Sequence, residues 1–432
     1  MSLPPRSPDA THMPGDLPAI AEDAATATDD QARPRTASRI AGLDIARGLA
    51  VIGMFAAHLL TRRDLGWDPD SWRFIAFGRS SILFAVLAGI SIALLSGRQT
   101  PLDGIPLVQA RMRILVRAVL IFAIGGLLLM LDTGIAIILE YYGLFFALAI
   151  PFLRWPPRRL FTLAAILTVV SPVAHLFLEN LSENTERIRW SPTIVRLFVI
   201  GYYPAMIFIV YVLVGMGLGR LDLSSRRVQA RMLVIGALLA TIGYTAGHFT
   251  HEWWAPVPET PAPAAAAQRD CVRGSDGVVR CADAEPAPEP TVSLWDFSGL
   301  WTFEQHTGSP FEITGSTGVA VAVLGVCLML TRPMQLALYP LAAVGSMALS
   351  AYAGQLIAFH ILRRAELRKY EVESFLWFTL ATLAVCTIWR LLLGQGPLER
   401  LLNVVSSKAA GLPVRRSPLP IVTALRKLAP GQ

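Results

Sequence analysis

Long apolar segments separated by short polar ones make up most of this chain from residue 39 onward. Each apolar segment has about twenty residues, which is the length that an α-helix needs to cross roughly 30 Å of hydrocarbon. The pattern therefore predicts an all-α, polytopic membrane bundle of about ten transmembrane helices. The predicted spans are roughly 41–61, 73–96, 112–131, 133–153, 159–179, 196–219, 230–250, 312–331, 335–362 and 374–394.

Polar stretches divide the rest of the chain. Residues 1–38 are rich in Pro, Ala, Thr and Asp without an apolar core, so we expect a disordered cytoplasmic tail and no secretory signal. The membrane domain is predicted for residues 39–405, and a second cytoplasmic tail for 406–432. Residues 252–291 form a Pro/Ala-rich insertion. The aromatic and polar segment that follows, up to about residue 311, is expected to fold over the membrane surface as a lid or site wall.

Arginines in alternate short loops predict the orientation. The positive-inside rule places those loops, and with them both termini, in the cytoplasm. The basic segment RRAELRKY at 363–370 falls on the outer side of the membrane in this topology, which disagrees with the positive-inside rule. Cys271 and Cys281 agree, because their loop falls outside, where a disulfide can form across the Gly-Ser-Asp-Gly turn between them.

Composition argues against several other classes of protein. Only 16% of the residues are charged, below the roughly 25% usual for soluble domains. The net charge of +7 comes from arginines in short loops, where they orient membrane helices, so it does not indicate binding of nucleic acid. His248 and His251 lie at i and i+3 without a third ligand, and no zinc spacing, phosphate-cradling loop or serine elbow is present, so no metal is predicted.

Four ionisable residues lie in or against the first two spans, where an uncompensated charge costs several kcal/mol. They are Asp44, Arg47, His58 and Arg79. The first three share one face of the first helix, with roughly 21 Å of rise from Asp44 to His58. Asp44 and Arg47 are one turn apart and can pair as an anchor of the helix start. Alternatively, Arg47 faces a phosphate-bearing ligand that enters from the cytoplasm.

Six of the seven histidines fall at outer helix ends or in outer loops of this topology. Two of them are functional candidates: His58 ends an apolar run, and His306 lies in a Glu-Gln-His-Thr-Gly-Ser-Pro stretch that enters a helix. For each, the alternative is local hydrogen bonding alone. Glu140, about two turns into the fourth span, must pair with a cation or stay protonated. Arg79 is its expected partner, and an ion pair and a catalytic acid are both open.

Two stripes of small residues at i+4 spacing predict close helix packing. One comprises Ser81, Ala85, Gly89 and Ala93, and the other comprises Ala342, Ser346, Ser350, Gly354 and Ala358.

Several motifs carry a family resemblance. LDIARGLAVIGMFAAH, GRSSILFAVLAGISIAL, HTGSPFEITGSTG, PLAAVGSMALSAY and GQGPLER resemble the YeiB-like bacterial membrane proteins, which are in turn distantly similar to the heparan-α-glucosaminide N-acetyltransferases. The resemblance covers nearly all of 39–405 except the Pro/Ala loop. It implies a multi-pass protein of the bacterial inner membrane that moves an acetyl or similar group from cytoplasmic acyl-CoA to a cell-envelope glycan or lipid.

One departure from that family concerns the catalytic histidine. The eukaryotic relatives carry it in the loop after the first helix, and the corresponding WDPDSW here has no histidine. The relatives' asparagine at the helix end corresponds to His58. Either His58 or His306 has taken over the role, or this branch is not an acetyltransferase.

Under the acyl-transfer hypothesis, His58 or His306 is the general base or the acylated group, and Glu140 is a further acid candidate. Arg79 would stabilise the oxyanion. The residues expected near the CoA phosphates are Asp44, Arg47, Arg111 and Arg113. No permanently bound cofactor is expected, because acyl-CoA would be a substrate. The protein is expected to lie in the lipid bilayer and to form a homo-oligomer. A transporter or flippase for a lipid-linked or small solute, and a structural or regulatory component, are the alternatives.

Overall fold

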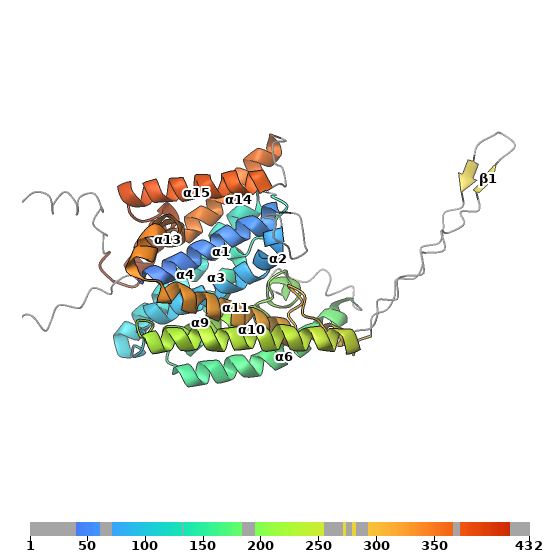
Figure 1. Ribbon diagram of the computed structural model, residues 1–432, viewed down its shortest axis with the longest axis horizontal. Helices are drawn as coiled ribbons and strands as arrows, with labels where there is room; N and C mark the ends of the chain where they lie inside the picture. Colours follow the sequence, from blue (N-terminus) through green and yellow to red (C-terminus); the bar gives the residue numbers. More distant parts are fainter. Residues whose placement is uncertain are drawn as a thin grey trace, which may run out of the picture. The chain divides into compact units, whose positions relative to one another are not determined.

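The computed structural model describes residues 40–60, 71–131, 133–183, 195–254, 293–365 and 372–414, with the backbone of two short strands at 271–273 and 279–281. Apart from that strand pair, the described residues form helices joined by turns, so the all-α prediction is confirmed (Figure 1). The predicted tail at 1–38, most of the insertion at 252–291 and residues 415–432 lie outside the described residues.

The helices follow one another along the chain with short connections. They are α1 (Ala41–Leu59), α2 (Trp72–Ala76), α3 (Arg79–Leu95), α4 (Gly104–Leu129), α5 (Leu139–Ala149), η2 (Ile150–Phe152), α6 (Pro157–Glu183), η3 (Arg196–Ile200), α9 (Ala205–Gly219), α10 (Arg226–Trp254), η4 (Ser298–Trp301), α11 (Pro310–Met329), α12 (Arg332–Ala337), α13 (Tyr339–Ser346), α14 (Ala348–Arg364), α15 (Val372–Leu392) and α16 (Pro397–Ala409). The helix α16 runs past residue 405, where the membrane domain was predicted to end.

Seven helical segments within the described residues are long and apolar enough to cross a membrane. They are α1, α2 with α3 (Trp72–Leu95), α4, α6, α10, α11 and α15. An eighth span results if α13 and α14, which meet at 84°, count as one bent span. The segments α5 with η2 (Leu139–Phe152) and α9 are apolar but shorter. Each of the ten predicted segments thus contains helix. The fourth begins only at Leu139, so Glu140 lies in the first turn of α5 and not about two turns into the span as predicted. The count of ten and the cytoplasmic position of both termini stay predictions.

A half-buried carboxylate holds the bend between α13 and α14. Glu399, in the first turn of α16, accepts hydrogen bonds from the backbone N–H groups of Leu349 (2.8 Å) and Ser350 (3.1 Å) and from the Ser350 hydroxyl (2.5 Å). These N–H groups belong to the first turn of α14, which has no partners for them within the helix. An anionic acceptor at a helix N-terminus satisfies them and is favoured by the helix dipole. The GQGPLER motif therefore fixes where α14 starts.

The first small-residue stripe is a packing surface, as predicted. At Gly89 on α3, an added Cβ would lie 2.1 Å from the carbonyl oxygen of Val212 on α9, and at Gly215 it would lie 2.0 Å from that of Val86. Only glycine allows these two backbones to approach so closely. The second stripe differs, because a Cβ at Gly354 on α14 would meet no atom within 4 Å. That part of the stripe faces open space rather than another helix.

The two strands lie in the extracytoplasmic insertion predicted from the sequence. β1 (Cys271–Arg273) pairs antiparallel with β2 (Val279–Cys281), and Cys271 lies opposite Cys281 in the register. The predicted hairpin is present in the described backbone, and the Cys271–Cys281 disulfide stays a prediction.

Gly89, which contacts another helix, and Gly354, which faces open space, give a direct test of the packing of α3 on α9. Gly89→Leu should lower the stability by about 3 kcal/mol, because its side chain would push a backbone carbonyl away. Gly354→Ala, the matched control, should leave the stability unchanged or raise it by up to about 1 kcal/mol, because alanine favours the helix over glycine. Midpoints of thermal unfolding in detergent measure both changes. Equal midpoints for the two variants would contradict the packing of α3 on α9.

Candidate functional site

His58 and His306, the two histidines selected from the sequence, line one cavity of about 280 Å³. We call it the histidine cavity. His58 comes from the end of α1, and His306 comes from the segment between η4 and α11. The other residues of the lining are Met54, Ala57, Ala76, Phe77, Gly78, Ser80, Ser81, Gly134, Ile135, Ala136, Tyr202 and Tyr203. The cavity thus combines an apolar wall with two imidazoles and several hydroxyl groups.

Glu312, which the sequence analysis did not select, fixes the backbone around His306. Its carboxylate is 3% exposed and accepts hydrogen bonds from the N–H groups of His306 (2.8 Å) and Gly308 (2.7 Å). Ser309 caps α11, because its hydroxyl accepts from the N–H of Glu312 (3.0 Å). His306 has a φ of +67°, a conformation that needs such support in a residue other than glycine. The Ser-Pro-Phe-Glu sequence is the signal of a capping box, but here the glutamate accepts from the N–H groups of His306 and Gly308 instead of that of Ser309, which donates to Thr307.

Aromatic rings surround the His306 imidazole. The ring centroids of Tyr202, Phe77 and Tyr203 lie 4.7, 5.0 and 5.6 Å from that of His306. Burial among these rings disfavours the imidazolium and lowers the pKa of His306 to about 4. The side chain is therefore neutral at pH 7, with a lone pair on one ring nitrogen. A neutral imidazole of this kind can take a proton or attack an acyl carbon.

The second imidazole is oriented by an amide. The Gln355 side-chain nitrogen on α14 donates to Nδ1 of His58 (3.2 Å), and the Phe359 ring packs edge-on against His58. Because Nδ1 accepts, the proton of a neutral His58 lies on Nε2. Gln355 was not among the residues predicted from the sequence to form the site.

Arg79 and Glu140, the remaining predicted catalytic residues, do not line this cavity. The Arg79 guanidinium donates to the Tyr244 hydroxyl (2.8 Å) and to the Phe74 carbonyl (2.6 Å). The expected pair of Arg79 with Glu140 is therefore wrong, and the cation whose charge acts on Glu140 is Arg196. Bonding of Arg79 within the protein explains the difference, since its donors are already directed at fixed acceptors. Their roles as oxyanion ligand and acid stay predictions.

Arg47 lines a second cavity, also of about 280 Å³, near the opposite end of α1. We call it the arginine cavity. Arg47 donates to Asp44 (2.9 Å) and to the Ser91 hydroxyl (2.8 Å), so the predicted Asp44–Arg47 pair is confirmed. Arg117 on α4 lines the same cavity and donates to Ser406 on α16 (3.2 Å). Glu399 is also part of the wall, but its charge is met by the start of α14.

Two other predicted arginines lie near rather than in this cavity. Arg111 is exposed and Arg113 is half-buried, and neither lines the wall. The charge of Arg113 nevertheless acts on Arg117, one turn further along α4. Arg117 was not predicted as a site residue. The signal that could have indicated it is its i, i+4 spacing from Arg113 within an apolar helix.

A thin layer of protein separates the two cavities. Tyr142 on α5 lines the arginine cavity, and its hydroxyl donates to the carbonyl of Ser81 (3.3 Å), which lines the histidine cavity. The Phe84 ring packs against Tyr142 with 5.2 Å between centroids. The structure thus contains two cavities that approach one another from the two ends of α1, with Tyr142 and Ser81 between them.

Comparison with protein families gives a match for the part of the chain that forms most of this architecture. Residues 39–248 match the family of the heparan-alpha-glucosaminide N-acetyltransferase catalytic region. The resemblance seen in the sequence is thereby confirmed for this part. The match spans 210 of the 432 residues, from α1 into α10, and it includes His58, Arg47, Arg117 and Tyr142 but not His306. No curated protein and no solved structure matches the chain significantly.

Replacement of one Glu312 carboxyl oxygen should release the His306 backbone. In Glu312→Gln the side-chain NH2 group cannot accept from one of the two backbone N–H groups. A buried donor left without its acceptor costs about 1–3 kcal/mol, so amide hydrogen exchange at His306 or Gly308 should speed up by about 5–100-fold. Glu304→Gln is the matched control, because Glu304 is exposed in the same segment. Unchanged exchange in Glu312→Gln would show that the carboxylate does not hold this segment.

The lowered pKa of His306 also predicts a pH dependence of stability. The folded protein binds the His306 proton only near pH 4, whereas the unfolded chain binds it near pH 6.5. The stabilisation is therefore present above pH 6.5 and is lost as the pH falls to 4, by about 3 kcal/mol at most. His306→Phe keeps an aromatic ring in the cage and has no such proton. We expect the wild type to lose stability relative to this variant between pH 6.5 and 4, and parallel unfolding curves would refute the assignment.

Proposed function

We propose that this protein is a transmembrane acyltransferase that moves an acetyl or similar group from acyl-CoA to a cell-envelope acceptor. The observation that carries the proposal is that His58 and His306 line one cavity, in a chain whose residues 39–248 match the family of an acetyltransferase catalytic region. Under the cytoplasmic placement of both termini, the arginine cavity opens to the cytoplasm and the histidine cavity to the outside. The protein would then lie in the bacterial inner membrane.

The arginine cavity is the proposed site of the acyl-CoA thioester. A cavity of about 280 Å³ takes only the slender thioester arm, so the nucleotide part would rest at its mouth. Arg47 and Arg117 lie in the wall, and Arg113 and the exposed Arg111 lie along the same helix as Arg117. Guanidinium groups bind phosphates with two donors each, which suits the several phosphates of CoA.

The two histidines have different proposed roles. His306 is neutral at pH 7 and can take the proton of the acceptor as a general base, or accept the acyl group itself. His58, with its proton on Nε2, can donate a hydrogen bond to the oxygen that becomes negative as the acyl carbon is attacked. This assignment gives His58 the task that the sequence analysis had given to Arg79.

One observation favours a second candidate function. Two cavities separated by a single tyrosine contact are also typical of proteins that expose a site alternately to the two sides of a membrane. A flippase or transporter for a lipid-linked or small solute would use the same cavities without breaking a thioester. Stabilisation of the protein by CoA, but not by candidate solutes, favours the acyltransferase.

Labelled acetyl-CoA supplied to inside-out vesicles tests the main proposal. Wild type should move label into the lipid or glycan fraction of the vesicles, and His306→Ala should reduce transfer by about 100-fold or more, because general-base catalysis contributes about that much. His58→Ala should reduce it by a similar factor, since one oxyanion donor contributes about 100-fold.

The control for this experiment is His251→Ala, at an exposed histidine of α10 that does not line the cavity. Its transfer rate should equal that of the wild type. If all four proteins transfer label at the same rate, or none does while CoA leaves their thermal stability unchanged, the proposal is wrong.

A further inference from the structure

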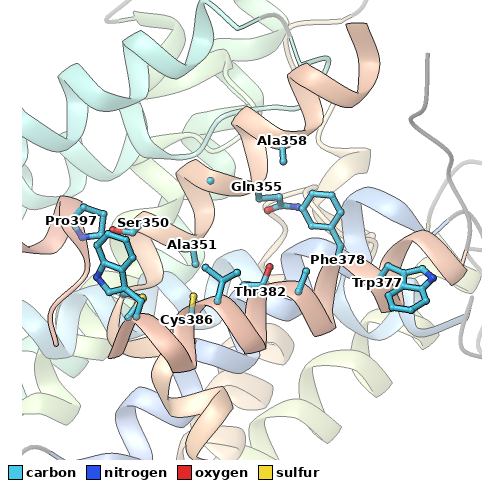
Figure 2. A pocket seen from close by; sticks show the side chains of 14 residues that line it. Ser350, Ala351, Gln355, Ala358, Trp377, Phe378, Thr382, Cys386 and Pro397 are labelled. Atoms are coloured by element: carbon cyan, nitrogen blue, oxygen red, sulfur yellow. The ribbon is translucent and has the colours of Figure 1, made fainter. Parts of the chain in front are cut away.

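A third cavity lies between α14 and α15 and forms a groove of about 530 Å³ (Figure 2). We call it the lipid groove. Its wall is almost entirely apolar and includes Ala351, Ala358, Phe378, Val385 and Cys386. The α15 part of the lining runs from Trp377 to Trp389, which corresponds to roughly 18 Å of helix. The groove therefore has the length and polarity of a site for an alkyl chain.

The groove faces the bilayer rather than the interior of the bundle. Only Phe375 and Cys386 of α15 are buried, so most of this membrane-length helix is on the outside. Across from it, Gly354 leaves open space where a side chain would project. A chain dissolved in the membrane can reach such a groove sideways, without crossing the polar surface.

Three polar side chains interrupt the apolar wall, namely Ser350, Gln355 and Thr382, and Gln355 is the one that also reaches the histidine cavity. Gln355 is 2% exposed, and its amide nitrogen bonds to His58, whereas its Oε1 has no partner among the described residues. In Figure 2 it lies between the two helices, on the side of α14 that faces Phe378. A buried polar atom without a partner costs about 1–3 kcal/mol, which a ligand can recover by bonding to it. The amide thus has one end at the histidine cavity and the other available to a ligand of the groove.

We infer that the lipid groove binds the acyl acceptor, and that this acceptor is a long-chain membrane lipid with a free hydroxyl group at the head of its chain. A hydroxyl group is favoured because the amide nitrogen is bonded to His58, so the end left without a partner is Oε1, which needs a donor. This inference rests on the proposed acyl transfer and specifies its substrate class. Gln355 acts as a positioning residue that places the hydroxyl next to His58.

The chemistry of the step balances without a further reactant. For this step the thioester end of acyl-CoA has to advance from the arginine cavity past Tyr142 to the histidine cavity. The lipid hydroxyl oxygen then attacks the thioester carbonyl carbon, so that a C–O bond forms and the C–S bond breaks. The hydroxyl proton passes to the neutral imidazole of His306 and then to the departing CoA thiolate. The products are an acyl ester of the lipid and free CoA.

Photo-crosslinking of the full-length protein in lipid vesicles tests the site independently of turnover. The probes are hexadecanol with a photoreactive group in its chain and the same molecule as its methyl ether, which cannot donate a hydrogen bond. We expect the alcohol to label α14 and α15 peptides about fivefold more than the ether, the ratio that one hydrogen bond provides. Gln355→Leu should abolish this preference and keep the labelling by both chains.

Gly354→Leu should reduce labelling by both probes, because the new side chain fills the groove at a position with space for it. Ala165→Leu is the matched control, since Ala165 lines a different apolar cavity, between α6 and α10. Equal labelling by alcohol and ether in the wild type, or unchanged labelling in Gly354→Leu, would overturn the inference.

The two proposals fail in different ways. Acyl transfer in the vesicle assay without a preference for the alcohol would mean that the acceptor binds elsewhere, and the present inference would be wrong. A preference for the alcohol that depends on Gln355, together with no transfer of label to any acceptor, would support the groove as a lipid-alcohol site and refute the acyltransferase.

Discussion

A carboxylate removed from water in an apolar bundle must be met by hydrogen-bond donors. Two carboxylates, the buried Glu312 and the half-buried Glu399, fix the parts of this molecule that form its cavities. Glu312 gathers the backbone of the segment before α11 and thereby places His306. Glu399 receives the first N–H groups of α14 and thereby sets the bend from which that helix begins. In both cases the donors are backbone groups that would otherwise lack partners in a medium without water. Because each carboxylate needs donors and each of these N–H groups needs an acceptor, the position of each backbone segment relative to its carboxylate is specific.

The bend has effects at both cavities and at the groove. Because α14 starts at Ala348 and leaves α13 at 84°, its Gln355 reaches His58 on one side and the lipid groove on the other. A straight helix through Met347 would direct these residues elsewhere. The GQGPLER motif lies far from His58 along the chain, yet it contributes to the position of the amide that orients this histidine.

The ten apolar segments and the Asp44–Arg47 pair were predictable from sequence, because span length and helical spacing are local properties. Sequence could not predict that His58 and His306 line the same cavity, because no local pattern relates the end of α1 to the segment before α11. The partner of Arg79 was predicted wrongly. Its charge in an apolar helix required a partner, and Glu140 was expected, but the structure gives it the Tyr244 hydroxyl from a distant helix and the nearby Phe74 carbonyl. Gly354 belonged to a stripe that looked like its counterpart on α3, and only the neighbouring helices decide whether such a stripe packs or stays open.

The contact between Tyr142 and Ser81 has an electrical consequence. Where water fills a cavity from each side, the membrane voltage falls mainly across the layer that remains dry, and in this protein that layer includes the Tyr142 ring and its contact with Ser81. A charge that passed this point would experience most of the membrane potential, about 2.3 kcal/mol per 100 mV. A neutral acyl group would experience almost none of it. The same ring would prevent a continuous file of water from forming, so that protons would stay on their own side of the membrane while larger uncharged groups are handled.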